Sequence, residues 1–534
     1  MRSARRILPL LLALVLTGCT MQSTPSQPEE PDSGTASETA AETIAETEPY
    51  LTGDVLPVLS IETKSRAENV MDFVTEPVAE HVAKSIASWT PGYKMPPAPY
   101  YEACTVTLTD AGGKVLLSGA DADVKVRGNW TTTYNKKPLR LKFAEGQEML
   151  GLNDDASLKN WVLLAEYKDG SMLRNKAALE ISQSILGKDG LYSADAALVE
   201  VEINGQYWGV YLLTEQQQVN ADRVAVTKPE NGYEGTDIGY FLEYDGYFTQ
   251  EDALHAFAVD YAGNAPLVPF DGEDGGGRTL APLPAMRDKQ VGMSIKSDTY
   301  SQEQHDFIEH FVCGAYKILY AAAYEDKALA FNADFSEIAE DPSLTPQQAA
   351  EQVVNAESLA DMYIISELTC DADIYWSSFF LDADFGADGD KRLTFEAPWD
   401  FDSAMGNKNR CPDGTGFYAA NILKDVNDQY DTINPWLAVL MYEDWFRDII
   451  RDRWTAAYDA GVFSDACAQI RADAQTLEPA FTRNYRRWDN LLHNEARNEL
   501  SRRAAHCRTQ AEAADYLAEW LETRVAFLND YWHE

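Results

Sequence analysis

Basic residues are scarce in this chain of 534 residues, in which 44 lysines and arginines face 86 aspartates and glutamates, for a net charge of −42. Nucleic-acid binding needs a basic surface that meets the phosphate backbone, so this balance argues against a nucleic-acid partner. It does not exclude a local basic site for a small phosphate ligand. Hydrophobic residues make up 45% of the chain, which is enough for a large core and excludes a mostly disordered protein.

Long apolar runs are also scarce. The apolar stretch at residues 7–16 is only ten residues long, which is too short to span a bilayer. It follows an arginine-containing head and ends in Leu16-Thr-Gly-Cys19, a combination typical of a bacterial lipoprotein signal. An ordinary secretory signal that happens to end in cysteine is the alternative. We expect residues 1–19 to be a signal peptide with its lipobox, and the protein to be extracytoplasmic and lipid-anchored to the membrane through Cys19.

Cysteine is rare and never closely spaced, because the chain has seven cysteines and none forms a Cys-x-x-Cys pair. A structural zinc site is therefore not expected. An exported chain could form disulfides, but no pairing follows from the sequence, and we expect buried free thiols. Residues 20–54 are rich in Ser, Thr, Glu and Pro, which predicts a disordered acidic tether.

Alternation of polar and apolar residues predicts that residues 55–215 are mainly antiparallel sheet. The clearest hairpin joins Val199–Ile203 to Gly209–Leu213 across Asn204-Gly205, a favoured tight-turn dipeptide. The other expected elements are strands at residues 104–109, 114–117, 123–127, 138–143 and 160–166, and a helix at residues 169–186.

Helical spacing dominates residues 216–534. Residues 262–284 are an exception, because they are rich in Gly, Pro and Asp and predict an exposed insertion. The chain is therefore expected to be α+β. The clearest elements are helices at residues 303–330, 356–370 and most of 432–534, and a short strand pair at residues 378–381 and 393–395.

Two polar segments are candidates for binding phosphate and metal. The first runs from Arg127-Gly-Asn-Trp130 to Lys136 and Lys137, where a small-residue turn and cations could meet phosphates. A solvated basic hairpin is the alternative. The second is Asp400-Phe-Asp402, whose carboxylates share one side of an extended segment and suit Mg²⁺ or Ca²⁺. An Asx-type turn at a strand end is the alternative.

A third segment, Asp371-Ala-Asp373, is a candidate for acid–base chemistry. It closes the apolar helix predicted at residues 356–370, where the helix dipole disfavours acidic residues. A carboxylate just after a helix can act as a general base. Simple exposure in a loop explains this segment equally well.

Taken in order, these segments resemble the CotH kinase family, the spore-coat-type atypical kinases. The resemblance runs from about residue 55 to the C-terminal helices, and its six ordered blocks make it specific. It implies a bilobal kinase-like fold, with a mostly antiparallel β N-lobe at residues 55–215 and a mostly helical C-lobe at residues 216–534. The matching stretches are Val124–Trp130, Lys136–Phe143, Asn160–Tyr167 with Ser171–Lys176, Val199–Glu215, Gly239–Asp245 and Pro398–Asp402 followed by Gly406-Asn407.

The resemblance also implies roles for acidic and basic residues. Asp373 matches the catalytic-loop acid that accepts the proton of the substrate hydroxyl. Asp400 matches the metal-binding aspartate, and Asp402 supports it. Lys137 ranks before Lys142 as the lysine that neutralises the phosphates of ATP. The cofactors implied are ATP and Mg²⁺ or Mn²⁺.

Four further residues complete the implied site. Arg127 lies in the phosphate-facing loop, Arg174 on the helix that takes the place of a kinase regulatory helix, and Glu215 at the hinge beside adenine. Ser378 stands where many members of the family have an asparagine as second metal ligand. A hydroxyl is a poorer Mg²⁺ ligand than an amide oxygen, so an inactive relative stays open.

Three functions are therefore compatible with the sequence. The first is a surface-anchored kinase that transfers phosphate from ATP to hydroxyl groups of a protein substrate at the cell surface. The second is a non-catalytic kinase-like scaffold that binds a partner or cell-wall component, which the scarcity of ATP outside cells favours. The third is a solute-binding lipoprotein, although the ordered blocks do not suggest two similar α/β lobes.

A basic island interrupts the acidic chain between Arg471 and Arg508. Arg483, Arg486 and Arg487 cluster there beside Trp488. The island either contacts an acidic substrate or forms a helix face that pairs with the acidic remainder of the chain.

Overall fold

The computed structural model describes residues 53–65, 67, 70–75, 101–128, 130–272, 291–408, 410–424, 431–493 and 495–534. The predicted signal peptide, Cys19 and the tether up to residue 52 lie outside the described residues, as does the predicted insertion from residue 273 onward. Tyr50–Glu534 form one compact unit.

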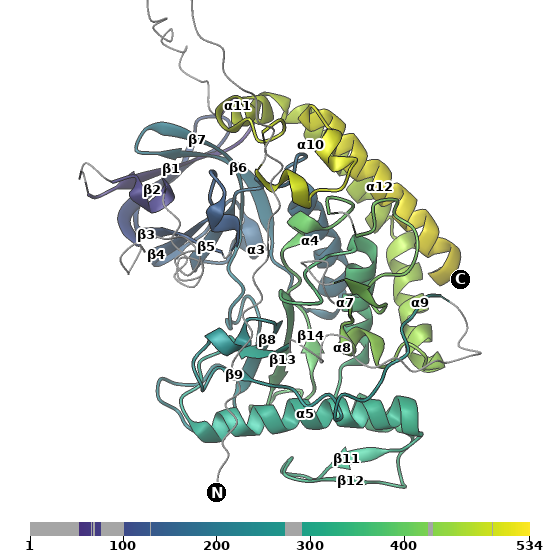
Figure 1. Cartoon of the computed structure of the whole chain (residues 1–534). Helices are drawn as coiled ribbons and strands as arrows, with labels where there is room; N and C mark the ends of the chain where they lie inside the picture. The colour runs from purple at the N-terminus through teal and green to yellow at the C-terminus, as the bar shows by residue number, and fades with distance from the viewer. Residues whose placement is uncertain are drawn as a thin grey trace, which may run out of the picture. The chain divides into compact units, whose positions relative to one another are not determined.

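Seven strands close into a barrel in the order β1-β2-β3-β4-β5-β7-β6 (Figure 1). Neighbouring strands are antiparallel except β1 and β6, whose parallel pairing closes the barrel. Alternate side chains point inward and form a separate apolar core around Trp161. The strands are β1 (Val58–Thr63), β2 (Glu102–Thr109), β3 (Val115–Val126), β4 (Leu139–Gln147), β5 (Leu158–Leu164), β6 (Ala196–Ile203) and β7 (Gln206–Glu215).

The barrel confirms the predicted hairpin across Asn204-Gly205, where β6 meets β7. Both turn residues have positive φ values, 52° and 71°, as a tight turn between twisted strands requires. The strands predicted separately at residues 114–117 and 123–127 are one strand, β3, whose exposed half pairs with β2. Residues 118–121 between the two predicted strands lack a buried face, so their sequence gave no sign that the strand continues.

The helix predicted from residue 169 begins only at residue 174. Asp169 accepts hydrogen bonds from the backbone N–H groups of Leu173 and Arg174, at 3.0 and 2.9 Å, and so prevents an earlier helical start. The resulting helix, α4 (Arg174–Leu186), buries most of its side chains. Two short helices, α1 (Asp72–Thr75) and α3 (Leu152–Asp155), accompany the barrel.

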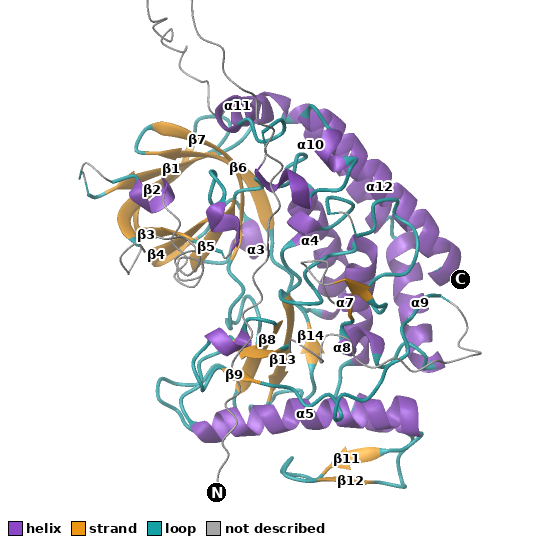
Figure 2. Ribbon diagram, in the orientation of Figure 1, coloured by secondary structure: helices purple, strands orange, loops and turns teal. Residues whose placement is uncertain are grey.

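A second sheet, with five antiparallel strands in the order β14-β13-β8-β10-β9, lies outside the barrel (Figure 2). The strand pair predicted at residues 378–381 and 393–395 is present as β13 and β14. The rest of this sheet was not predicted, because β8, its central strand, is buried on both faces and shows no alternation. Helices remain the main elements after residue 215, as the sequence predicted. Its strands are β8 (Gly239–Asp245), β9 (Ala256–Phe257), β10 (Gly292–Ile295), β13 (Phe379–Asp384) and β14 (Thr394–Phe395).

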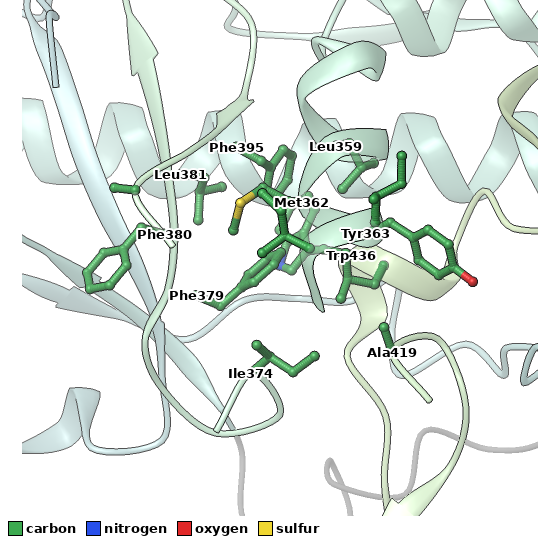
Figure 3. Packing of buried hydrophobic residues seen from close by; sticks show 14 of the residues in the cluster. Leu359, Met362, Tyr363, Ile374, Phe379, Phe380, Leu381, Phe395, Ala419 and Trp436 are labelled. Atoms are coloured by element: carbon green, nitrogen blue, oxygen red, sulfur yellow. The ribbon is translucent and has the colours of Figure 1, made fainter. Parts of the chain in front are cut away.

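Helices pack around this second sheet. The central helix α7 (Ala356–Thr369) has buried residues on all sides, and Figure 3 shows Met362 on the side of Phe379 and Phe395, whereas Tyr363 points away from them. Helix α7 contacts α9, and α10 contacts α12. The other helices are α5 (Gln302–Glu325), α6 (Pro346–Glu351), α8 (Pro435–Ala438), α9 (Asp444–Asp459), α10 (Val462–Thr476), α11 (Glu478–Trp488) and α12 (Gln510–Trp532).

Small sheet pieces complete the described residues. They are β11 (Leu329–Phe331) with β12 (Ile338–Glu340), and β15 (Leu423–Lys424) with β16 (Asp431–Thr432). The first pair replaces the end of the helix predicted at residues 303–330. The α+β class is thus confirmed, and the barrel is an addition to it. The two-lobed arrangement and its boundary at residue 215 stay predictions.

The six cysteines in the described residues are free. Four of them are buried, as the sequence predicted: Cys104, Cys370, Cys411 and Cys467. Among the described helices, none combines the length and the apolar character that crossing a bilayer requires.

Candidate functional site

A cleft of about 1660 Å³ is lined by residues of both the barrel and the five-stranded sheet. On the barrel side its lining comes from the ends of β3 and β5 and from the loop before β4. On the other side it comes from β8, β13 and the loops that follow α7 and β14, and residues 498–500 complete it. Asp373, Asp400, Asp402, Ser378 and Arg127 all line this cleft, so the fold brings these five sequence-predicted residues together.

The loops that carry the aspartates have unusual backbone conformations. Cys370, which ends α7, has a φ of 47°, Ser378 has a φ of 60° and Asp400 has a φ of 72°. Residues with a Cβ atom adopt this left-handed region rarely, and such strain is concentrated at functional sites. Residues with left-handed backbone conformations therefore occur in both of the loops that carry the aspartates.

Burial and mutual repulsion determine the electrostatics of the aspartates. Burial, followed by the negative charges of Asp402 and Asp373, raises the pKa of Asp400 to about 8. Burial also raises the pKa of Asp373, although Lys168 opposes this shift. Buried carboxylates that repel one another are stabilised as anions by a cation between them.

Lys168 is the principal cation beside the aspartates, and sequence reasoning missed it. Its Nζ atom lies 3.2 Å from Asp402 Oδ1 and 3.9 Å from Glu499 Oε2, and it also donates to Ser403 Oγ. Burial opposes its charge, but the carboxylates of Asp402 and Asp373 outweigh burial and raise the pKa of Lys168. Lys168 lies between two of the matching sequence blocks, so the resemblance did not include it. The one sequence feature that could have suggested a role for Lys168 is its place between an apolar strand and Asp169.

Lys137 and Lys142, which the resemblance assigns to the phosphates of ATP, do not line the cleft. Lys137 is buried and donates from Nζ to the carbonyl oxygens of Thr132 and Tyr134, both at 2.8 Å. Lys142 is exposed on β4. The neighbouring Lys136 lines the cleft instead.

Lys136 is held by the barrel rather than by solvent. Its Nζ atom donates to Ala165 O at 2.7 Å and to Val210 O, and lies 4.4 Å from the ring centroid of Tyr211. Burial lowers the pKa of Lys136 to about 7, although Glu166 opposes the shift. An ammonium group so enclosed supports the barrel wall of the cleft.

Arg174 and Glu215 hold the structure around the cleft without lining it. Arg174 is fully buried, pairs with Asp169 and donates to Met405 O at 3.4 Å. Glu215 is buried and pairs with Arg223 at 3.0 Å. Beside Glu215, the segment Gln216–Gln218 lines the cleft at the end of β7. Arg127 does line it, with its guanidinium 5.7 Å from the ring centroid of Trp399.

Asn175 links α4 to the loop of Asp400. Its Nδ2 atom donates to Glu166 Oε1 at 3.0 Å, and its Oδ1 atom accepts from the backbone N–H of Phe401 at 2.8 Å. Asn175 and Glu166 both line the cleft. The position of α4 therefore fixes the backbone immediately after Asp400.

The donors in the cleft fit a divalent cation that prefers oxygen. Asp373, Asp400 and Asp402 offer carboxylates and Ser378 offers a hydroxyl, which are hard ligands suited to Mg²⁺ or Mn²⁺. In the described residues, His305, Asp306 and Glu309 on α5 are the one group of three ligating side chains whose atoms lie within 4.8 Å of one another. The aspartates of the cleft would therefore have to draw together to share an ion.

Basic side chains surround the acidic centre of the cleft. They offer charges for a phosphate-bearing ligand in a chain that is otherwise strongly acidic. Lys408 and Arg410 act on Asp373 and oppose its rise in pKa. The basic residues in the lining, apart from Lys136 and Lys168, are Lys125, Arg127, Arg140, Lys296, Lys408, Arg410 and Lys424.

The basic island near the C-terminus does not belong to this cleft. Arg483 is buried and pairs with Asp54 at 2.6 Å and Glu200 at 2.7 Å. Arg471 pairs with Glu522 at 2.7 Å. These contacts favour the interpretation that the island pairs with acidic residues of the same chain.

A cleft that joins aspartates, a buried lysine and a basic lining to a β-barrel is compatible with a phosphate-handling protein. The sequence profile described as CotH kinase protein matches residues 124–528, which is more than half of the chain. The chain belongs to the CotH kinase family, and this membership indicates a kinase-like protein. It is also 29% identical over 136 residues to the inner spore coat protein H of Bacillus subtilis (strain 168), a match that covers 26% of this chain and 33% of that protein.

Proposed function

We propose that the protein is a kinase that transfers phosphate from ATP to hydroxyl groups of proteins. The observation that carries this proposal is that Asp373 and Asp400, which come from different loops, line one cleft and act on each other electrostatically. Family membership supports a kinase-like chemistry, and the basic lining supports a phosphate-bearing ligand.

In this proposal Asp373 is the general base. A carboxylate at this position would accept the proton of the substrate hydroxyl as the new bond to phosphorus forms. Asp400, with Asp402 and Ser378, would hold Mg²⁺ or Mn²⁺, which neutralises charge on the phosphates of ATP when it is bound. Lys168 would hold the side chain of Asp402 in position, because its ammonium group lies 3.2 Å from that carboxylate.

The nucleotide would lie along the barrel side of the cleft. Arg127 is the sequence-predicted cation that the cleft retains, and it would meet phosphate oxygens. The segment Gln216–Gln218 would border the base, next to the predicted hinge residue Glu215. Lys408 and Arg410, on the other side near Asp373, would border the transferred phosphate.

We further propose that the protein works outside the cytoplasm, anchored through a lipid on Cys19, with protein substrates at the cell surface. The arginine-containing head, the short apolar stretch and the cysteine that follows it support this location. Such a location requires a supply of ATP or another phosphoryl donor outside the cell.

A non-catalytic kinase-like scaffold is the second candidate, and Ser378 is the observation that favours it. A neutral hydroxyl is a weak ligand for a second cation, and loss of that ligand is one way in which a kinase-like cleft keeps binding but loses transfer. In that case the cleft would bind a nucleotide or a partner and transfer nothing.

The test is a phosphate-transfer assay with ATP and Mg²⁺ or Mn²⁺ on the protein itself and on a generic protein. We expect transfer by the wild type, and a loss of at least about 100-fold in Asp373→Ala and in Asp400→Ala, because each removes a group of the reaction itself. Lys159→Ala, which changes an exposed lysine on β5 that does not line the cleft, serves as the control. A wild type that neither transfers phosphate nor is stabilised by nucleotide with metal would support the scaffold instead.

A further inference from the structure

Asp371 has a buried carboxylate oxygen for which the protein supplies no hydrogen bond. The residue is 1% exposed, and its Oδ1 atom accepts the backbone N–H of Asp373 at 3.1 Å. Its Oδ2 atom has no hydrogen-bond partner. A buried carboxylate oxygen without a donor is strongly unfavourable, so such an atom in a native fold indicates an ion or a role in chemistry.

The surroundings of Asp371 are acidic. The charged groups that act on it most strongly are the carboxylates of Asp373, Asp400 and Asp402. Lys168 already contacts Asp402 and Ser403. These carboxylates repel one another, and a divalent cation that draws them together turns that repulsion into attraction.

We propose that Asp371 is a ligand of a divalent cation, which it holds through Oδ2 from the protein side of the cleft, together with Asp400. The inference rests on the proposed function, because it adds a buried anionic ligand to the same metal site. It gives the site an anionic oxygen where Ser378 offers only a neutral hydroxyl. Because Oδ1 of Asp371 already holds the backbone of Asp373, an ion on Oδ2 would also fix the position of the proposed base.

Asp371→Asn separates this role from a purely structural one. The asparagine keeps the Oδ1 atom that accepts the backbone N–H of Asp373. It replaces Oδ2 with the uncharged amide nitrogen Nδ2, which cannot ligate the ion. Asp371→Ser is a second variant, whose hydroxyl also offers an acceptor to the backbone of Asp373 and which covers the case that the asparagine variant does not fold.

Asp382→Asn is the matched control. Asp382 is likewise buried, at 6% exposed, and its Oδ2 atom also has no hydrogen-bond partner. It differs from Asp371 in its neighbours, because the charged group that acts on it most strongly is Glu396 and not an aspartate of the cleft. Both asparagine variants relieve repulsion between buried carboxylates. Only the change at Asp371 should affect the binding of a cation.

The experiment measures Mn²⁺ binding by electron paramagnetic resonance, and melting temperature with and without Mn²⁺, on the full chain without nucleotide. We expect Asp371→Asn to melt higher than the wild type in metal-free buffer, to bind Mn²⁺ at least tenfold more weakly, and to lose the stabilisation by Mn²⁺. We expect Asp382→Asn to melt higher as well and to keep the wild-type Mn²⁺ affinity within twofold.

Wild-type Mn²⁺ affinity in Asp371→Asn, or in Asp371→Ser if the first variant does not fold, overturns the inference. A wild type that binds no Mn²⁺ overturns it as well. Failure of the inference and of the proposed function remain distinguishable. Binding of Mn²⁺ that depends on Asp371 without phosphate transfer removes the proposed function alone, and transfer with unchanged Mn²⁺ affinity in Asp371→Asn removes the inference alone.

Discussion

Lys168 lies among several negatively charged groups of the cleft. It contacts Asp402 and Ser403, lies 3.9 Å from Glu499, and its pKa is raised by the carboxylates around it despite burial. A buried carboxylate that loses its cation is left uncompensated, which is more damaging than the loss of an exposed ion pair. Lys168 therefore matters both for the fold around the acidic centre and for its chemistry.

We predict that Lys168→Met lowers kcat/KM for phosphate transfer by about 100-fold or more, because it removes the fixed charge that holds Asp402 at the proposed metal site. The melting temperature should fall at the same time, since Asp402 loses its partner. Transfer kinetics and thermal unfolding on the same preparation check both effects, with Lys159→Met as the control on an exposed lysine. A Lys168→Met protein with half or more of the wild-type kcat/KM would contradict this role.

The neighbouring lysines show how far single residues could be predicted from the sequence. The six-block resemblance was sufficient to choose Arg127, Ser378 and the three aspartates that line the cleft. It ranked Lys137 before Lys142 as the lysine for the phosphates of ATP, and neither of them lines the cleft. Lys136 and Lys137 lie in the loop before β4, where no regular periodicity indicates which side chain faces the cleft. Lys168 went unrecognised because its importance comes from groups far away in the sequence, and Asp371 was noted only as part of the segment that carries Asp373.

At the scale of elements, α4 and the loop before it connect the barrel to the loop of Asp400. Asp169 joins Ser171, Leu173 and Arg174 through hydrogen bonds to its carboxylate, and Asn175 on the next position holds the backbone of Phe401. The helix α4 thus fixes the loop of Asp400 relative to β5. A substitution at the start of α4 should therefore alter the cleft, although it changes no residue that lines the cleft.

We predict that Asp169→Ala lowers the free energy of unfolding by about 3 kcal/mol or more, because it leaves the buried guanidinium of Arg174 without its carboxylate. Arg174→Met in the same protein should recover part of the loss, since the unpaired charge disappears. Chemical denaturation of both single variants and the double variant completes the cycle. A loss below about 1 kcal/mol in Asp169→Ala would show that the pair does not hold this helix.

Alternation of polar and apolar residues identifies elements with one buried face, and it gives no signal for strands that are buried on both faces or exposed. The hairpin of β6 and β7 was predictable from alternation and from the turn residues Asn204-Gly205. The helix α7 was predictable because its apolar segment is too long for a typical strand. The central strand β8 has no polar face, so its sequence gives no alternation, and the five-stranded sheet was missed. The start of α4 was misplaced because the side chain of Asp169 competes for backbone donors that a helix would otherwise use.

At the scale of the whole molecule, an acidic protein concentrates cations in one cleft and buries several carboxylates. Glu396 is one of these carboxylates. It accepts the backbone N–H of Tyr192 at 2.6 Å, and burial raises its pKa to about 7, although this hydrogen bond and Asp382 oppose the shift. The folded protein therefore holds a proton on Glu396 in a pH range where the unfolded chain has released it.

We predict that Glu396 makes the folded protein less stable as pH rises from about 4.5 to about 7. In this window the folded state binds more protons than the unfolded state, so the free energy of unfolding falls with pH. The shift corresponds to about 3 kcal/mol at most. Denaturation at pH 5 and pH 8 should show a smaller loss in Glu396→Gln, which has no titrating group there, than in the wild type. Equal losses in both proteins would contradict the raised pKa.

The central claim is that Asp373 is the general base and Asp400 a metal ligand for phosphate transfer in one cleft. The most direct measurement compares the affinity for ATP with Mg²⁺ and the single-turnover rate of transfer in Asp373→Asn and Asp400→Asn. We predict that Asp373→Asn keeps nucleotide affinity within about threefold and loses transfer by about 100-fold or more, whereas Asp400→Asn loses both the metal-dependent part of the affinity and transfer. Nucleotide binding and transfer that survive in both variants would contradict the account.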